Sequence, residues 1–128
     1  MIEVEKRDGS IVVFDSSKIF SAISKAFDSL HMEKDDAIIN LLVLRATADF
    51  QTKIKDNRIS VEMIQDSVEK TLSESGYYPV AKTYILYRKQ RENVRKIQST
   101  ANEYIHLVNS YLHDNISLED ENSMATYS

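Results

Sequence analysis

The sequence predicts an α+β fold in which a small N-terminal β-hairpin caps a bundle of about four α-helices. Two short stretches of alternating apolar residues flank Asp8-Gly9 near the start of the chain. After them, apolar residues recur at helical spacing in four successive segments, separated by residues that suit the ends of helices. The length of 128 residues fits one domain, or one domain with a tail.

The hairpin is predicted from the alternation of residues 2–6 and 11–14 around Asp8-Gly9. Asp-Gly favours a two-residue type I′ loop, because that turn needs positive φ at both of its central residues. The cross-strand pairs that this loop predicts are Arg7 with Ser10, Lys6 with Ile11 and Val4 with Val13. The face expected to pack on the helices carries Ile2, Val4, Ile11 and Val13. The opposite face carries Glu3, Glu5, Arg7, Val12 and Phe14.

The next two segments predict two helices joined by a connection over residues 31–34. Asp15 or Ser16 can cap the first helix, and Asp35 with Asp36 suits the positive end of the second. The apolar positions of the first helix are Ile19, Ile23, Ala26, Phe27 and Leu30. Those of the second helix are Ile38, Ile39, Leu42, Ala46 and Phe50.

Two further helices follow a charged connection over residues 53–59. Ser60 caps the third helix and Gly76 ends it, while Pro79 suits the first turn of the fourth. The fourth helix can run past Arg95, because neither Gly nor Pro follows Pro79. The main apolar positions are Val61, Ile64, Val68 and Leu72 in the third helix and Val80, Tyr84 and Tyr87 in the fourth. From about residue 113 the pattern fades, which indicates either a poorly ordered tail or the beginning of a segment that has been removed.

The composition excludes several classes of function. Sixteen Lys and Arg against twenty Asp and Glu give a net charge of -4, which is not typical of a general nucleic-acid binder. The absence of cysteine excludes disulfides, a thiol nucleophile and a cysteine-ligated metal. No apolar run approaches the roughly 20 residues of a membrane span, and the charged N-terminus does not resemble a signal peptide. We therefore expect a cytoplasmic protein without a membrane or nucleic-acid partner.

The charge is nevertheless uneven along the chain. Residues 82–96 carry six cations against Glu92 alone, and residues 114–128 carry four carboxylates and no cation. The basic segment could face an anion, with Arg88 and Lys89 closing a phosphate site, or it could be the solvated side of a long helix.

Three cations near the N-terminus indicate an anion site. Lys6 and Arg7 lie beside the turn, and Lys18 falls in the first turn of a helix, where the dipole disfavours a cation by a few tenths of a kcal/mol. A phosphate beside Lys18 would reverse that sign, since helix N-termini bind anions. The hypothesis is one triphosphate pocket formed by the three cations. From spacing alone, the alternative of three solvated surface cations stays open.

Several stretches taken together resemble the ATP-cone, the nucleotide-sensing regulatory domain of ribonucleotide reductases and of a related bacterial transcriptional repressor. The resemblance covers residues 2–92 in the right order and spacing. It rests on Val4-Glu5-Lys6-Arg7-Asp8-Gly9, Phe14-Asp15, Lys18-Ile19, Ile64-Gln65-Asp66-Ser67-Val68-Glu69 and Ala81-Lys82-Thr83-Tyr84-Ile85-Leu86-Tyr87-Arg88. The family fold, a β-hairpin cap over a helical bundle, agrees with the elements predicted above.

The resemblance implies a role for each residue of the pocket. Val4, Lys6 and Arg7 line it with the cations on phosphates, and Lys18 is a further phosphate ligand. Val12, Asp15 and Ile19 surround the adenine and ribose. Val61 and Gln65 fall where the family places nucleotide contacts on the third helix, although some members have Thr and His there. Arg88 or Lys89 supplies the last cation. No catalytic residue and no protein-held metal is implied.

A second, shorter resemblance concerns the C-terminal part of the chain. Val108-Asn109-Ser110-Tyr111-Leu112, Glu121-Asn122-Ser123 and Tyr127-Ser128 are similar to the segment that leads into the catalytic barrel of the anaerobic, class III, ribonucleoside-triphosphate reductase. It implies an ATP-cone over residues 1–95, and a helical extension and linker toward an absent catalytic domain over residues 96–128. The isolated chain is not expected to reduce ribonucleotides, because it has no cysteine to form a thiyl radical.

The family resemblance also implies the ligand and the partners. ATP or dATP is the expected allosteric effector, with Mg²⁺ as its companion ion. ATP would keep the reductase active and dATP would switch it off through a change in subunit association. The expected partners are the catalytic domain of the same reductase and other copies of the chain, through cone contacts.

Three alternatives stay open at this point. A nucleotide-dependent transcriptional repressor shares the cone, but its usual zinc ribbon needs cysteines that this chain lacks. A phosphate-hydrolysing enzyme finds no support in a Gly-rich phosphate loop or a carboxylate set for a metal. A structural helical interaction domain is the third alternative, and failure to bind any nucleotide would favour it.

Overall fold

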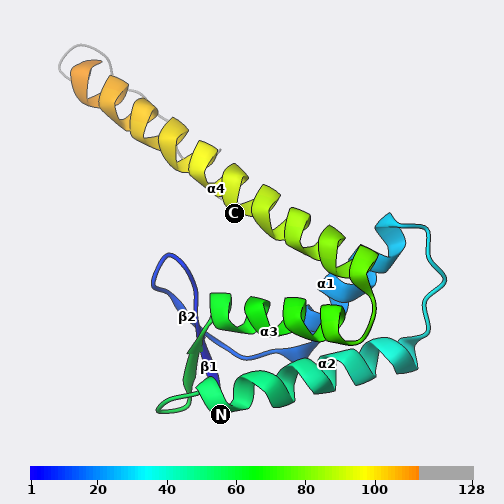
Figure 1. Cartoon of the computed structure of the whole chain (residues 1–128). Coiled ribbons are helices and arrows are strands. Elements are labelled where there is room, and N and C mark those ends of the chain that lie inside the picture. Colours follow the sequence, from blue (N-terminus) through cyan, green and yellow to red (C-terminus); the bar gives the residue numbers. More distant parts are fainter. Residues whose placement is uncertain (113–128) are drawn as a thin grey trace. The chain divides into compact units, whose positions relative to one another are not determined.

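The computed structural model of the chain describes residues 1–112 and contains two compact units. The first unit comprises residues 1–86, and the second begins at Tyr87. A small sheet and four helices confirm the expected α+β class. In chain order the elements are β1 (Glu3–Glu5), β2 (Ile11–Val13), α1 (Ser16–Ser29), α2 (Asp36–Phe50), the 3-10 turn η1 (Gln51–Lys53), β3 (Arg58–Ser60), α3 (Val61–Glu74) and α4 (Tyr78–Leu112) (Figure 1).

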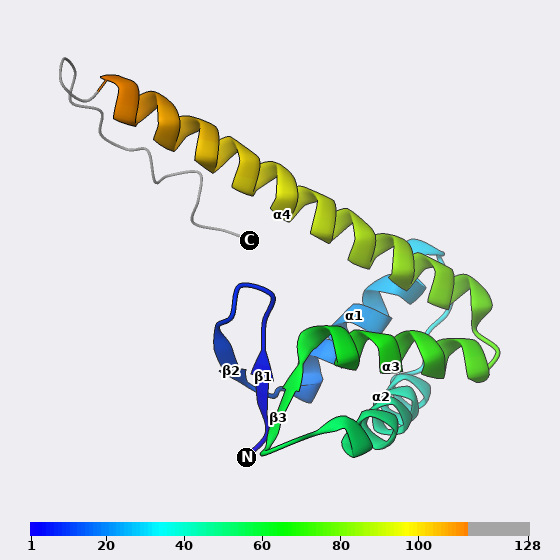
Figure 2. The same cartoon turned by 60° about the vertical axis from the view of Figure 1, so that its left-hand side comes forward.

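The sheet has three strands rather than the two of the expected hairpin. Its order is β2-β1-β3, with β1 antiparallel to β2 and parallel to β3 (Figure 2). The prediction that residues 53–59 form only a connection is therefore wrong. Ile59, in the middle of β3, is 3% exposed and pairs with Val4 of β1, so its burial stabilises the third strand.

A tight turn at Asp56-Asn57 leads directly into β3. Asp56 and Asn57 have φ of +53° and +60°, and the Lys55 and Arg58 backbones on either side exchange hydrogen bonds of 3.0 and 2.9 Å. This is the two-residue turn, with positive φ at both positions, that was expected at Asp8-Gly9. Asp and Asn tolerate that conformation better than most residues.

The first hairpin has a longer loop than predicted. The Lys6 N–H donates to the Ser10 carbonyl at 2.8 Å, and the Gly9 N–H donates to the Lys6 carbonyl at 3.0 Å. Gly9 has φ of +87°, whereas Asp8 does not have positive φ. The loop is thus Arg7-Asp8-Gly9 with glycine in the left-handed position, a common three-residue hairpin geometry.

The longer loop shifts the strand register by one residue. Val4 pairs with Val12, and Glu5 pairs with Ile11, so the predicted pairs are wrong. A shift of one residue moves each side chain of β2 to the other face. Val12 and Phe14 therefore pack against the core, while Ile11 and Val13 are 38% and 56% exposed. Phe14 meets Phe50 edge to face at a centroid distance of 5.6 Å.

The first three helices begin at the predicted capping residues. The Asp15 carboxylate accepts from the Ser17 N–H at 3.0 Å, and the Asp35 carboxylate accepts from the Ala37 N–H at 2.9 Å. The Ser60 hydroxyl accepts from the Met63 N–H at 3.2 Å. Each of these contacts satisfies a backbone donor that has no partner within its own helix.

One hydrophobic core joins the sheet to α1, α2, α3 and the start of α4. α2 and α3 lie side by side in both views (Figures 1 and 2). The predicted apolar positions are confirmed apart from Ile38, which is 39% exposed, and Tyr87, which is 42% exposed. The side chains with 0% exposure include Ile39, Phe50, Leu72 and Val80.

α4 continues without a break to Leu112, so its predicted extension past Arg95 is confirmed. The prediction of a poorly ordered tail from residue 113 lies outside the described residues. Across residues 1–112, no helix has both the length and the apolar character that crossing a membrane would require.

Candidate anion-binding site

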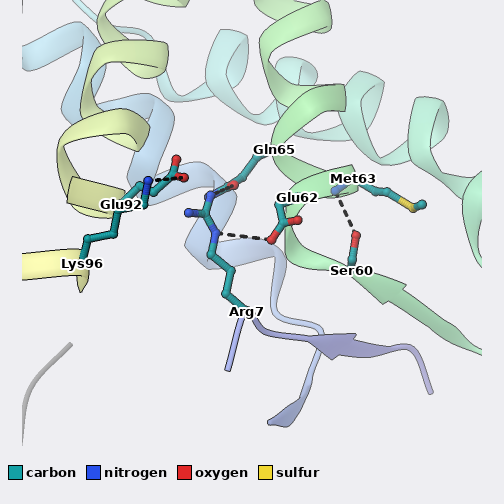
Figure 3. Close-up of polar contacts among 7 residues, drawn as sticks. All are labelled: Arg7, Ser60, Glu62, Met63, Gln65, Glu92 and Lys96. Carbon is teal, nitrogen blue, oxygen red and sulfur yellow. Dashed lines mark hydrogen bonds and ion pairs between the residues drawn. The ribbon is translucent and has the colours of Figure 1, made fainter. Parts of the chain in front are cut away.

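Arg7 reaches from the hairpin loop to the N-terminal half of α3 (Figure 3). Its Nη2 donates to Gln65 Oε1 at 3.4 Å, and its Nε lies 3.4 Å from Glu62 Oε1. The Arg7 side chain is 23% exposed, against 52% for that of Glu62. The structure therefore brings together two of the residues predicted for the site, Arg7 and Gln65, and adds Glu62 to them.

The sheet sets this arrangement. Glu5 of β1 pairs with Ser60 of β3. Glu5 lies two residues before Arg7, and Ser60 lies directly before α3. Ser60 also caps α3 through its hydroxyl, so no linker separates the strand from the helix. Consequently the first turns of α3 stand at a fixed position next to the loop that carries Arg7.

The apolar residues predicted for the site belong to the core or border it. Val4 and Ile19 are each 7% exposed and share one cluster with Ile64. Val12 and Val61 are half-buried and pack against the same cluster. A ligand can therefore contact only the parts of these side chains that are not covered by the core.

Lys6, Asp15 and Lys18 have exposed side chains. Lys6 directly follows β1, whereas Lys18 is in the first turn of α1 and donates its backbone N–H to the Asp15 carbonyl at 3.2 Å. Hydrogen bonds from the Ser17 hydroxyl and N–H lower the pKa of Asp15, with a smaller contribution from the charge of Lys18. Asp15 is thus an ionised cap with a cation beside it.

Arg88 and Lys89 lie on α4 beyond residue 86, in the second unit. Their participation in a site with the other nine residues stays a prediction. Sequence reasoning missed Glu62, because only the parallel pairing of β1 with β3 connects the first turn of α3 to Arg7. The three-residue spacing of Glu62 and Gln65, which puts both on one side of a helix, was the available signal.

The acidic and histidine side chains of residues 1–112 form no group of three or more that could hold a metal ion.

Comparisons with known proteins identify the family of the chain. Residues 2–93 match the model of the ATP cone domain. The chain is 36% identical over 120 residues to the ribonucleoside-diphosphate reductase subunit alpha of Chlamydia pneumoniae, a match that covers 88% of this chain and 12% of that protein.

Two other relatives represent different reductases. Identity is 40% over 103 residues to the vitamin B12-dependent ribonucleoside-diphosphate reductase of Thermoplasma acidophilum, covering 73% of this chain and 12% of that protein. The identity is 31% over 102 residues to the anaerobic ribonucleoside-triphosphate reductase of Escherichia coli, a match that covers 80% of this chain and 14% of that protein. The chain thus spans a small part of the length of these relatives. Because the family model matches most of the sequence, the chain belongs to the ATP cone domain family.

Proposed function

We propose that this chain is an allosteric domain that binds ATP or dATP and regulates the overall activity of a ribonucleotide reductase. The observation that carries the proposal is the Arg7 guanidinium beside Gln65 and Glu62 at the start of α3, within a chain of the ATP cone family. A guanidinium in this position can bind two oxygens of a phosphate group at once.

The phosphate part of the site follows from charge. Lys6, Arg7 and Lys18 would bind the triphosphate, and the N-terminal end of α1 adds partial positive charge. A phosphate carries more charge than the Glu62 carboxylate, so it would replace that carboxylate as the partner of Arg7. Mg²⁺ would accompany the triphosphate.

The nucleoside part of the site follows from the half-buried apolar residues. Val4, Val12 and Ile19 would contact the adenine, and Asp15 would accept from the ribose. Val61 and Gln65 would complete the site on α3, where Gln65 can both donate and accept a hydrogen bond.

ATP and dATP differ by one ribose hydroxyl, so the discrimination between them begins at contacts near that group. A regulatory switch requires the two ligands to favour different states by different free energies. The partners of that switch would be the catalytic domain of the same reductase and further copies of the chain, in the cytoplasm. Residues 1–95 would form the cone, and residues 96–128 would lead toward the catalytic part.

Two classes of parent enzyme compete. We propose the anaerobic ribonucleoside-triphosphate reductase first, on the resemblance of residues 108–112, 121–123 and 127–128, and the relatives include that class at 31% and 32% identity. A ribonucleoside-diphosphate reductase is the second candidate, favoured by identities of 36% to 40%. Any protein sequence encoded in the same reading frame after residue 128 can be aligned with both classes of reductase. The class to which it aligns better decides between the two candidates.

Calorimetric titration with ATP and with dATP tests the site. Lys18→Ala should lower the affinity about tenfold or more, and Lys6→Ala combined with Arg7→Ala should lower it further, since each removes a charge-assisted phosphate contact. Lys25→Ala is the matched control, because it removes an exposed lysine two turns further along α1. Equal affinity in all four proteins would exclude the pocket, and absence of binding in the wild-type chain would favour a structural domain.

A further inference from the structure

The second unit carries an apolar stripe with a seven-residue repeat on α4. The residues lie three and four positions apart in strict alternation, from Val94 to Tyr111. We call this the α4 stripe; its members are Val94, Ile97, Ala101, Tyr104, Val108 and Tyr111. Their exposed fractions reach 67% for Ile97 and Tyr104 and 84% for Tyr111.

The spacing of the α4 stripe indicates what kind of surface it fits. An average spacing of 3.5 residues is the repeat of helices that wind around one another, because a stripe of this period keeps facing the partner helix along its length. The stripe is about 26 Å long at the usual rise per residue, which corresponds to about two and a half heptads of contact. A partner helix is therefore the surface that this pattern matches.

The side chains of the α4 stripe complement each other when two copies run antiparallel. That orientation places Ala101 opposite Tyr104 and Ile97 opposite Val108, with Val94 opposite Tyr111 at each end. A parallel pair would instead place alanine opposite alanine and tyrosine opposite tyrosine. Alternating small and large residues fill the space between helices better than like against like.

The charges flanking the α4 stripe favour the same orientation. Residues 88–96 carry five cations and one carboxylate, and Glu92 is engaged with Lys96 at 3.9 Å (Figure 3). An antiparallel pair brings the C-terminal end of one helix, which carries partial negative charge, to the basic start of the other, whereas a parallel pair brings two basic segments together.

We propose that the α4 stripe is a self-association surface, and that its occupant is the same stripe of a second copy in antiparallel orientation. This contact lies wholly within the second unit and needs no nucleotide. It does not depend on the proposed site in the first unit.

Sedimentation equilibrium of the full chain without nucleotide tests the association. The wild-type chain should have the mass of a dimer. The double variant Ile97→Asp, Tyr104→Asp should have the mass of a monomer, because it places charges in the centre of the contact. The matched control Ser99→Asp, His106→Asp makes two substitutions to aspartate on the opposite side of the same helix and should stay dimeric. Equal helix content by circular dichroism shows that both variants fold.

Cysteine cross-linking tests the orientation, because the natural chain contains no cysteine. An equimolar mixture of Ile97→Cys and Val108→Cys chains should oxidise mainly to the mixed disulfide. In the antiparallel pair the two copies of position 97 are about 16 Å apart along the helix, beyond the reach of a disulfide. A wild-type monomer, a dimeric aspartate double variant, or disulfides mainly between identical chains would each overturn the proposal.

Discussion

α4 behaves differently in the two units of the molecule. In the first unit it buries its apolar residues, with Val80 at 0%, Ala81 at 3% and Tyr84 at 8% exposed. In the second unit the same helix continues without interruption, yet Ile97 and Tyr104 are 67% exposed. The difference shows that helix formation and burial have separate causes. Local sequence carries the helix onward, whereas burial requires neighbouring elements, which within residues 1–112 lie in the first unit.

Polar contacts between distant residues also mark the first unit. The carboxylate of Asp49 on α2 accepts from the Ser67 hydroxyl at 2.7 Å and from Lys70 Nζ at 2.9 Å, both on α3. Ser67 is fully buried, so this contact satisfies a hydroxyl that water does not reach. α2 and α3 are thus joined by a polar clamp as well as by apolar packing.

The largest expected effect comes from removing a core side chain of the first unit. Phe50→Ala should lower the free energy of unfolding by about 3–5 kcal/mol, because Phe50 is fully buried and leaves a cavity. Hydrogen exchange of the α2 and α3 amides measures this change. Tyr104→Ala, on the exposed part of α4, should leave those amides unaffected. Equal effects of the two substitutions would abolish the distinction between the units.

The polar clamp should contribute less than the core. Asp49→Ala leaves the buried Ser67 hydroxyl without its acceptor and should cost about 1–3 kcal/mol. Urea unfolding at neutral pH measures it. The exposed carboxylate of Asp66 on α3 offers a control, since Asp66→Ala changes the same charge without opening the clamp.

The clamp also predicts a pH dependence of stability. The Ser67 hydroxyl first, and then Lys70, lower the pKa of Asp49 below its ordinary value of 3.8. A carboxyl with a lower pKa in the folded state contributes stability above its unfolded pKa, and this contribution is lost as the pH falls through the folded pKa. Below pH 3.8 the wild-type chain should therefore lose stability more steeply than Asp49→Ala. Parallel curves would show that the clamp does not favour the ionised carboxylate.

The helices could be predicted from the sequence because their signals are local. Asp15, Asp35 and Ser60 cap them, and apolar residues repeat along each one over several turns. The sheet could not be predicted in the same way. Its strands have three residues each, so pairing partners distant in sequence decide the register. Asp8-Gly9 is a strong turn signal, but it occupies a longer loop, and the unnoticed Asp56-Asn57 forms the two-residue turn.

The candidate site, like the fold, could be predicted only in part from the sequence. The family resemblance named Arg7 and Gln65, and the structure brings the two together. Glu62 could not be connected to Arg7 without β3, whose contact with β1 spans more than fifty residues of sequence. Contacts of this kind arise from the sheet, so periodicity along a helix does not reveal them.

Arg88 and Lys89 test whether the second unit takes part in nucleotide binding. We expect Arg88→Ala or Lys89→Ala to lower the affinity for ATP by about tenfold, as for the loss of one charged contact. Calorimetry with each single variant identifies which of the two supplies the cation. Arg91→Ala is the control on the same helix. Unchanged affinity in both variants would confine the site to the first unit.

The smallest expected effect concerns Glu62. Glu62→Gln removes a carboxylate that competes with phosphate for Arg7, so the affinity for ATP should rise about threefold at low salt. The gain should shrink as salt screens the ion pair. Glu74→Gln, at the far end of α3, changes the same charge and should have no effect. A loss of affinity in Glu62→Gln would show that the carboxylate helps to hold the arginine in its binding position.

Ser60 serves two elements at once, as the last residue of β3 and the cap of α3. The chain therefore has no spare residue at this junction. One inserted residue would rotate α3 by about 100° relative to the sheet and turn Gln65 away from Arg7. Related sequences that keep this arrangement should therefore vary in length elsewhere, for example between α1 and α2, and keep the junction free of gaps.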